Sequence, residues 1–226
     1  MNGGVSSRIY EKIKSSITIE TTSIQLLVEA YNCAFIDKKY DLDWEEEQFT
    51  AHLVSIMNKL DLTKKFQLHI GIEEKLLDEE QLPIGANNPK SLPRMDINVE
   101  SWFFKEGKNL KYFFEAKNLC QNDWYKKSGA KVSENYYTKR YIDTGIENFR
   151  TGRYYNGALI GYILEGKVAP IVDKLNAELL KNTHTIHILK LESTSFQTNI
   201  KDLYKSTHLT PLGNNLDIKH LFLSFI

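Results

Sequence analysis

The spacing of hydrophobic residues predicts that the chain begins with helices and continues into a sheet. Apolar side chains recur at helical intervals through residues 8–36, which we predict to be helical in one or two pieces, and again through residues 44–60, which we predict to form a further helix. Residues 66–72 instead alternate apolar and polar side chains, which is typical of a strand. The change of period places the start of the sheet after the helix over residues 44–60.

The rest of the chain alternates strands with helices. Residues 94–104 and 110–118 are predicted strands joined by a short turn, which indicates a hairpin. The elements predicted after it are a helix over 133–150, a buried strand over 157–164, a helix over 170–180 and strands over 185–191 and 218–225. This order predicts an α/β fold, a three-layer sandwich with a central mixed β-sheet flanked by helices.

The length of 226 residues suits a single domain. Within 1–226 we distinguish an N-terminal helical extension (1–40), a core that carries the candidate chemistry (44–191) and a C-terminal loop and strand (192–226).

Composition restricts the partners that the protein can have. Lys plus Arg and Asp plus Glu both number 29, so no overall positive field indicates a nucleic-acid partner, although local patches can still provide one. Two cysteines give no disulfide framework. The N-terminus lacks the apolar stretch of a signal peptide, and the apolar runs are too short for a bilayer. We therefore expect a cytoplasmic protein without a membrane partner.

Three residues on the predicted hairpin propose a definite chemistry. Strand alternation places Glu115 and Lys117 on one face, and Asp96 lies on the neighbouring strand. Asp96 is as far from Ser101 as Glu115 is from Leu110, so the hairpin register predicts that the two carboxylates are cross-strand neighbours.

Two carboxylates held together favour a cation between them. Their oxygen atoms suit Mg²⁺, which can polarise a phosphodiester and lower the pKa of a bound water. Lys117 would hold that water and contact the phosphate. The alternative is a solvated polar face of an edge strand. The apolar run Tyr112–Phe114 argues against this alternative, because it indicates a central strand, and burying charges there is costly unless they are paired.

Asp96, followed on the next strand by Glu115-Ala116-Lys117, resembles the PD-(D/E)xK, or restriction-endonuclease-like, nuclease superfamily over residues 44–191. The family often has Pro-Asp where this chain has Met95-Asp96. The resemblance implies a restriction-endonuclease-like core, Asp96 and Glu115 as ligands of Mg²⁺ (with Mn²⁺ able to substitute) and Lys117 as the catalytic lysine. It also implies a nucleic-acid substrate, more often DNA than RNA.

Many members of that family add a glutamate from the first core helix. Glu46 is our choice for this third metal ligand and catalytic carboxylate, because it shares the inward face of the helix with Phe49 and Leu53; Glu47 is the second choice. The alternative is structural: Asp43 and Glu46 have capping-box spacing, and acidic residues suit a helix N-terminus in any case.

The stretch from Lys126 to Arg153 is the best candidate for phosphate contacts. It holds seven basic and three acidic residues, a local net charge of +4, with tyrosines interleaved. We expect Lys139 and Arg140 to bind substrate; the alternative is the wet face of an ordinary amphipathic helix. Because the whole chain is neutral, we also expect a homodimer or a companion subunit to contribute affinity.

The sequence thus predicts a Mg²⁺-dependent phosphodiesterase, specifically a DNA endonuclease that is a restriction enzyme or a bacterial antiviral defence effector. One alternative is a catalytically degenerate nuclease-like module that binds DNA or a partner protein. Another is a hydrolase acting on sugars, with Asp96 and Glu115 as acid and base. Lys117 argues against it, because a nearby cation lowers the pKa of a general acid.

No His/Cys cluster has zinc spacing, and we interpret His220 as a core histidine.

Overall fold

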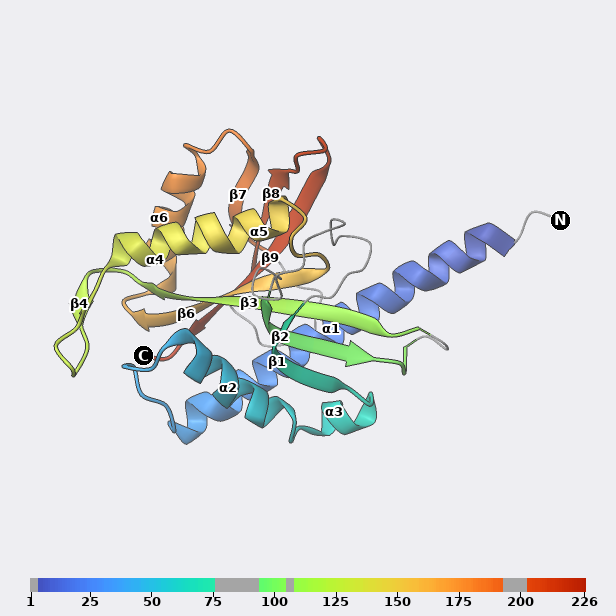
Figure 1. The fold of residues 1–226 in the computed structure, drawn as a ribbon, viewed down its shortest axis with the longest axis horizontal. Coiled ribbons are helices and arrows are strands. Elements are labelled where there is room, and N and C mark those ends of the chain that lie inside the picture. Colours follow the sequence, from blue (N-terminus) through green and yellow to red (C-terminus); the bar gives the residue numbers. More distant parts are fainter. Residues whose placement is uncertain (1–3, 76–93, 105–107, 193–202) are drawn as a thin grey trace, which may run out of the picture.

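Helices cover both faces of a central mixed β-sheet (Figure 1). The computed structural model describes residues 4–75, 94–104, 108–192 and 203–226. Among these residues the sheet has seven strands in the order β1-β2-β3-β6-β9-β8-β7. The strands are β1 (His69–Lys75), β2 (Arg94–Ser101), β3 (Leu110–Cys120), β6 (Gly157–Glu165), β7 (Thr185–Leu191), β8 (Leu203–Leu209) and β9 (Asn215–Ser224). Strand β6 pairs in parallel with β3 and β9, and the other neighbours pair antiparallel. The predicted α/β class with a mixed central sheet between helices is confirmed.

One face of the sheet packs against the N-terminal helices α1 (Gly4–Asp37) and α2 (Glu46–Met57), and the short α3 (Asp61–Lys65) follows them. The N-terminal part of α1 projects beyond the sheet (Figure 1). Phe49 of α2 packs between Tyr162 of β6 and Phe225, with ring centroids 5.5 and 4.7 Å away and the rings tilted. This apolar layer fixes α2 against the centre of the sheet.

The other face packs against α4 (Glu134–Arg140), η2 (Tyr141–Ile146), α5 (Glu147–Arg150) and α6 (Val168–Leu179). The helix predicted over residues 133–150 begins where expected, with Ser133 as the N-cap of α4. It is not one continuous α-helix, because the π-helical segment η2 separates α4 from α5. A Cβ atom at Gly145 of η2 would lie 3.0 Å from Leu159 Cδ2, so glycine lets the segment lie close against β6. Such π segments often occur at functional sites.

The predicted hairpin of β2 and β3 has the predicted register. Ser101 pairs with Leu110 and Ile97 with Phe114, while turn residues 105–107 lie outside the described part of the chain. Strand β3 lies inside the sheet between β2 and β6. Asp96 and Glu115 therefore lie next to each other just beyond the last pair, Ile97 with Phe114, on the strands and at the register that the sequence predicts.

The prediction for the C-terminal region was wrong in one respect. Residues 203–209, predicted as loop, form β8, and β9 lies between β8 and β6 inside the sheet. The polar Ser206, Thr207 and His208 are buried in β8, so the hydrophobic pattern does not reveal this strand. A small hairpin of β4 (Trp124–Tyr125) and β5 (Lys131–Val132) was also not predicted. No helix in the described ranges combines the length and apolar character needed to cross a membrane.

Candidate active site

The candidate residues on β3 lie on the face of the sheet that α4 and η2 cover. Phe114 and Ala116 pack into the apolar layer beneath α1 and α2, whereas Glu115 and Lys117 point to the opposite face. Both charged side chains are nevertheless buried, with 7% of the Glu115 and 5% of the Lys117 side chain exposed. Strand alternation alone thus places a carboxylate and an ammonium group side by side inside the protein.

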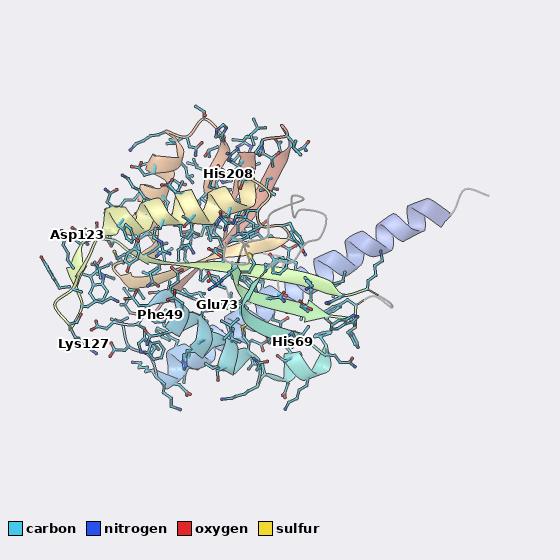
Figure 2. All side chains as sticks on the ribbon, in the orientation of Figure 1. Phe49, His69, Glu73, Asp123, Lys127 and His208 are labelled. Atoms are coloured by element: carbon cyan, nitrogen blue, oxygen red, sulfur yellow. The ribbon has the colours of Figure 1, made fainter. Side chains whose placement is uncertain are left out.

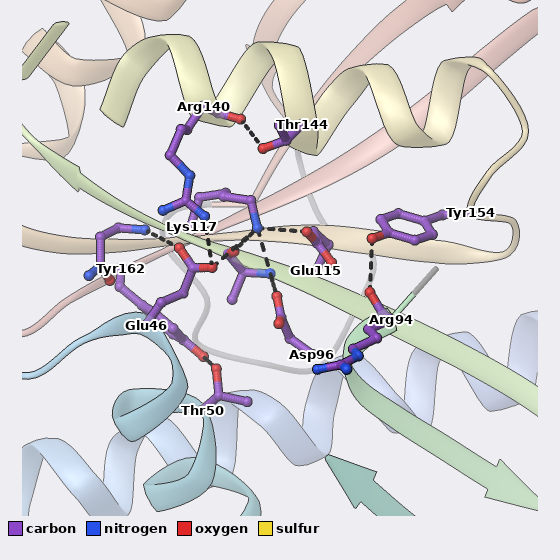
Figure 3. Close-up of polar contacts among 12 residues, drawn as sticks. Glu46, Thr50, Arg94, Asp96, Glu115, Lys117, Arg140, Thr144, Tyr154 and Tyr162 are labelled. Atoms are coloured by element: carbon purple, nitrogen blue, oxygen red, sulfur yellow. Dashed lines mark hydrogen bonds and ion pairs between the residues drawn. The ribbon is translucent and has the colours of Figure 1, made fainter. Parts of the chain in front are cut away.

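The Lys117 ammonium group is the centre of the site (Figure 3). Its Nζ donates to Glu115 Oε1 at 2.6 Å, to the Ala116 carbonyl at 2.6 Å and to Glu46 Oε1 at 3.2 Å. Asp96 Oδ2 lies 3.9 Å from the same atom. The structure therefore gathers Asp96, Glu115, Lys117 and Glu46 into one cluster.

The end of the β2–β3 ladder brings two of these carboxylates to β3. Beyond Phe114 the amides of β3 no longer pair with β2. The amide of Ala116 donates instead to Asp96 Oδ2 at 2.6 Å, and the amide of Asn118 donates to Glu46 Oε2 at 3.2 Å. Buried amides without a hydrogen-bond partner are costly, and here the carboxylates of Asp96 and Glu46 accept the hydrogen bonds that β2 does not.

Glu46 reaches the cluster because a neighbouring residue caps α2. Glu45 is the N-cap, and its amide donates to Gln48 Oε1 at 2.9 Å in a capping box. The alternative capping box of Asp43 with Glu46 is therefore wrong. Glu46 is 8% exposed, whereas Glu47 is exposed to solvent. Of the two predicted candidates, the structure places Glu46 at the cluster.

Burial and mutual repulsion make the carboxylates hard to ionise. Burial raises the pKa of all three carboxyl groups, and the Asp96 charge helps to raise the pKa of Glu115 to about 8. Burial opposes the charge of Lys117, but Glu115, Glu46 and Asp96 outweigh it and raise the pKa of the ammonium group. Lys117 lowers the pKa of Glu115, as the argument against a sugar hydrolase expected. Burial outweighs this effect, so the net pKa of Glu115 is raised and Lys117 alone does not decide against a general acid.

The donor chemistry of the cluster fits a hard cation. Glu115 Oε2 is buried and has no hydrogen-bond partner among the described residues. The three carboxylates supply oxygen ligands of the type that Mg²⁺ takes. In the described part of the chain no group of three or more His, Cys, Asp or Glu side chains is arranged to hold a metal ion. The carboxylates are spaced here around the Lys117 ammonium group.

Most cations of the predicted basic stretch already have acidic partners. Lys126, Lys127 and Lys131 pair with Glu45, Asp41 and Asp123 at 2.5, 2.7 and 2.6 Å, and Arg150 pairs with Glu147. Asp123 and Lys127 lie beside the β4–β5 hairpin (Figure 2). The Lys126 and Lys127 pairs join the hairpin to the segment that leads into α2, and all four pairs lower the charge available to phosphates.

The two predicted substrate residues differ in position. Arg140 Nη2 lies 3.7 Å from Glu46 Oε1, so Arg140 adjoins the cluster. Lys139 is exposed and has no ion pair within the described residues. The sequence did not single out Tyr154, which lies beside Glu115 and donates to the Arg94 carbonyl at 2.8 Å (Figure 3). Burial and then the Glu115 charge raise the pKa of Tyr154. Its sequence context carries no signal for this contact.

A second buried polar group lies on the same face of the sheet. The Tyr141 hydroxyl is 2.9 Å from His220 Nδ1, and Ser206 Oγ is 2.7 Å from Nε2 of both His220 and His208. One set of donors satisfies the chain: Tyr141 donates to His220, His220 to Ser206 and Ser206 to His208. Burial lowers the pKa of His220 to about 3 and that of His208 to about 4, so both are neutral. The prediction of a core histidine at position 220 is confirmed.

Comparison of the chain with protein-family models, with curated proteins and with solved structures finds no match.

Proposed function

We propose that the protein is a Mg²⁺-dependent nuclease with a restriction-endonuclease-like core, and that it hydrolyses phosphodiester bonds as a DNA endonuclease. The observation that carries the proposal is the cluster formed by β2, β3 and the start of α2, in which Lys117 Nζ lies within 3.9 Å of oxygen atoms of Glu115, Glu46 and Asp96. Three carboxylates around one lysine form a costly arrangement in a protein interior, and sites of this kind are concentrated at catalytic centres.

Each residue has a role in the proposed reaction. Asp96 and Glu115 would hold Mg²⁺, with Mn²⁺ as a substitute, and Glu46 would complete the ligand set. The metal would supply Lewis-acid polarisation of the phosphodiester and offset the charge of the transition state. Lys117 would orient the attacking water and donate to the scissile phosphate. Arg140 and Lys139 would contact the neighbouring backbone phosphates.

A restriction enzyme or an antiviral defence effector would use this chemistry, with a second copy or a companion subunit to add affinity to a chain of zero net charge. We propose that the protein acts in the cytoplasm, because the free thiols of Cys33 and Cys120 suit a reducing compartment.

The second candidate is a nuclease-like module that binds DNA or a partner protein without cutting. The observation that favours it is the pairing of Lys117 with the carboxylates, which neutralises part of their charge without a metal ion. A sugar hydrolase is less well supported, because an acid–base pair leaves Lys117 and Glu46 without a function.

Incubation of plasmid DNA, single-stranded DNA and RNA with Mg²⁺, Mn²⁺ or EDTA tests the proposal. We expect cleavage that EDTA abolishes, and a loss of at least about 100-fold in Lys117→Ala or Glu115→Ala, the size of a lost general acid–base or metal contribution. The exposed pair of Glu178 in α6 and Lys181 just after it supplies controls, since alanine at either position should leave cleavage unchanged.

Wild-type rates in Lys117→Ala or Glu115→Ala would overturn the site assignment. Intact nucleic acid under every metal condition would favour the binding module, because a correctly folded wild type would then lack the proposed chemistry.

A further inference from the structure

Tyr136 is an exposed aromatic residue that Arg140 links to the cluster. Whereas Tyr141 of the same stretch is 0% exposed and Tyr154, just after that stretch, is 5% exposed, Tyr136 is 58% exposed. Its neighbour Tyr137 lies 5.6 Å away, centroid to centroid, and contacts Asn118, the residue after Lys117. Tyr137 thus fixes α4 against β3, while the ring of Tyr136 remains open to solvent.

Arg140 connects this ring to the cluster. Its guanidinium carbon lies 5.9 Å from the centroid of Tyr136, and Nη2 lies 3.7 Å from Glu46 Oε1. One guanidinium group therefore separates the exposed ring from a carboxylate that contacts Lys117. A base stacked on Tyr136 would bring its sugar and phosphate close to Arg140 and to the proposed reaction centre.

The charges around the site favour stacking over phosphate binding. In the stretch from Lys126 to Arg153, five of the seven cations lie within 4 Å of a carboxylate oxygen: Lys126, Lys127, Lys131, Arg140 and Arg150. A duplex binds chiefly through many phosphate contacts. A strand with unpaired bases can instead gain affinity from an aromatic face.

From this geometry we propose that Tyr136 and Arg140 form a stacking site for an unpaired base, so that the substrate of the cluster is single-stranded or locally unpaired nucleic acid. The inference rests on the proposed nuclease function and specifies its substrate class. It assigns Tyr136 as a substrate-binding residue.

Fluorescence anisotropy with a labelled single-stranded 12-mer and the matching duplex tests the inference, in EDTA so that no strand is cut. We expect the wild type to bind the single strand at least about tenfold more tightly than the duplex. Tyr136→Ala should lose roughly tenfold in single-strand affinity, the order expected for one stacking contact, and Tyr136→Phe should retain it. The control is Tyr125→Ala, which removes an exposed tyrosine of β4.

Salt titration adds a second measurement. If Lys139, Arg140 and Arg153 make the phosphate contacts, the slope of log K against log salt should be about −2, from roughly −0.7 per contact for a single strand. A steep slope together with preference for the duplex would overturn the inference. Unchanged single-strand affinity in Tyr136→Ala would also overturn it.

The two proposals can fail separately. Stacking on Tyr136 without cleavage of any substrate would retain the inference and reject the catalytic proposal. Metal-dependent cleavage of duplex DNA that is unaffected in Tyr136→Ala would retain catalysis and reject the stacking site.

Discussion

Two buried polar groups lie on one face of the same sheet and have opposite electrostatic character. The cluster around Lys117 combines charged groups, with three carboxyl pKa values raised and Glu115 Oε2 without a partner in the described residues. The chain from Tyr141 through His220 and Ser206 to His208 is neutral and hydrogen-bonded along its length. Adjacent residues of one helical segment contact the two groups, Arg140 the first and Tyr141 the second.

The difference separates a candidate site from a structural element. A satisfied neutral chain stabilises a buried interface, because each donor has an acceptor and no charge loses its hydration. The Lys117 cluster keeps acidic groups that repel one another and one buried oxygen, Glu115 Oε2, that lacks a donor among the described residues. Such an arrangement costs stability, so it is expected where the protein needs the charges for chemistry.

The largest effect should follow from removal of the central cation. Lys117→Met leaves the buried Glu46 and Glu115 and the partly buried Asp96 without their shared cation and should lower the free energy of unfolding by about 3–5 kcal/mol. Urea denaturation at pH 7 without metal measures it, with Lys127→Met as a control for an exposed lysine. The double variant Lys117→Met, Glu115→Gln should recover part of the loss. Equal stability of Lys117→Met and wild type would show that the cluster is not held by this ammonium group.

A smaller loss should follow from breaking the neutral chain. Tyr141→Phe removes the donor to His220 Nδ1 and should cost about 1–3 kcal/mol, the penalty of one unsatisfied buried group. Nucleic-acid cleavage, measured below the unfolding transition, should stay near wild type. Loss of cleavage in a stable Tyr141→Phe protein would show that the histidine chain acts in the reaction and would end the contrast between the two groups.

The smallest effect is a difference in pH dependence. The folded state keeps His220 and His208 neutral, with pKa values of about 3 and 4 against the ordinary 6.5, so their contribution to stability is lost as pH falls below about 6.5. Glu115 has the opposite sign: its folded pKa of about 8 exceeds the ordinary 4.5, so its contribution is lost as pH rises through this interval.

Glu115→Gln should therefore gain stability relative to wild type by up to about 1.4 kcal/mol between pH 5.5 and pH 6.5, the value of one pH unit for one proton. Urea denaturation at both pH values gives the comparison. A difference between variant and wild type that does not change with pH would contradict a raised pKa for Glu115.

The sequence predicted those parts of the fold that have a simple period. The hairpin register followed from equal distances to Ser101 and Leu110, and the inward face of α2 followed from Phe49 and Leu53. Strand β8 was missed because buried polar residues, including Ser206 and His208, replace the apolar residues expected in a core strand. Ser206 and His208 are hydrogen-bonded to each other, and Ser206 also contacts His220, which is distant in the sequence, so no local hydrophobic pattern marks the strand.

By itself, the sequence determined which face of β3 carries Glu115 and Lys117, because side chains alternate along any strand. It also placed Asp96 beside them through the hairpin. The sequence favoured Glu46 over Glu47 as the third carboxylate. Only the tertiary structure decided the contacts of Glu46, since these depend on Glu45 capping α2 and on an Asn118 amide that β2 does not pair. It likewise decided that the carboxylates are hard to ionise, because their pKa values depend on burial beneath helices that are remote in the chain.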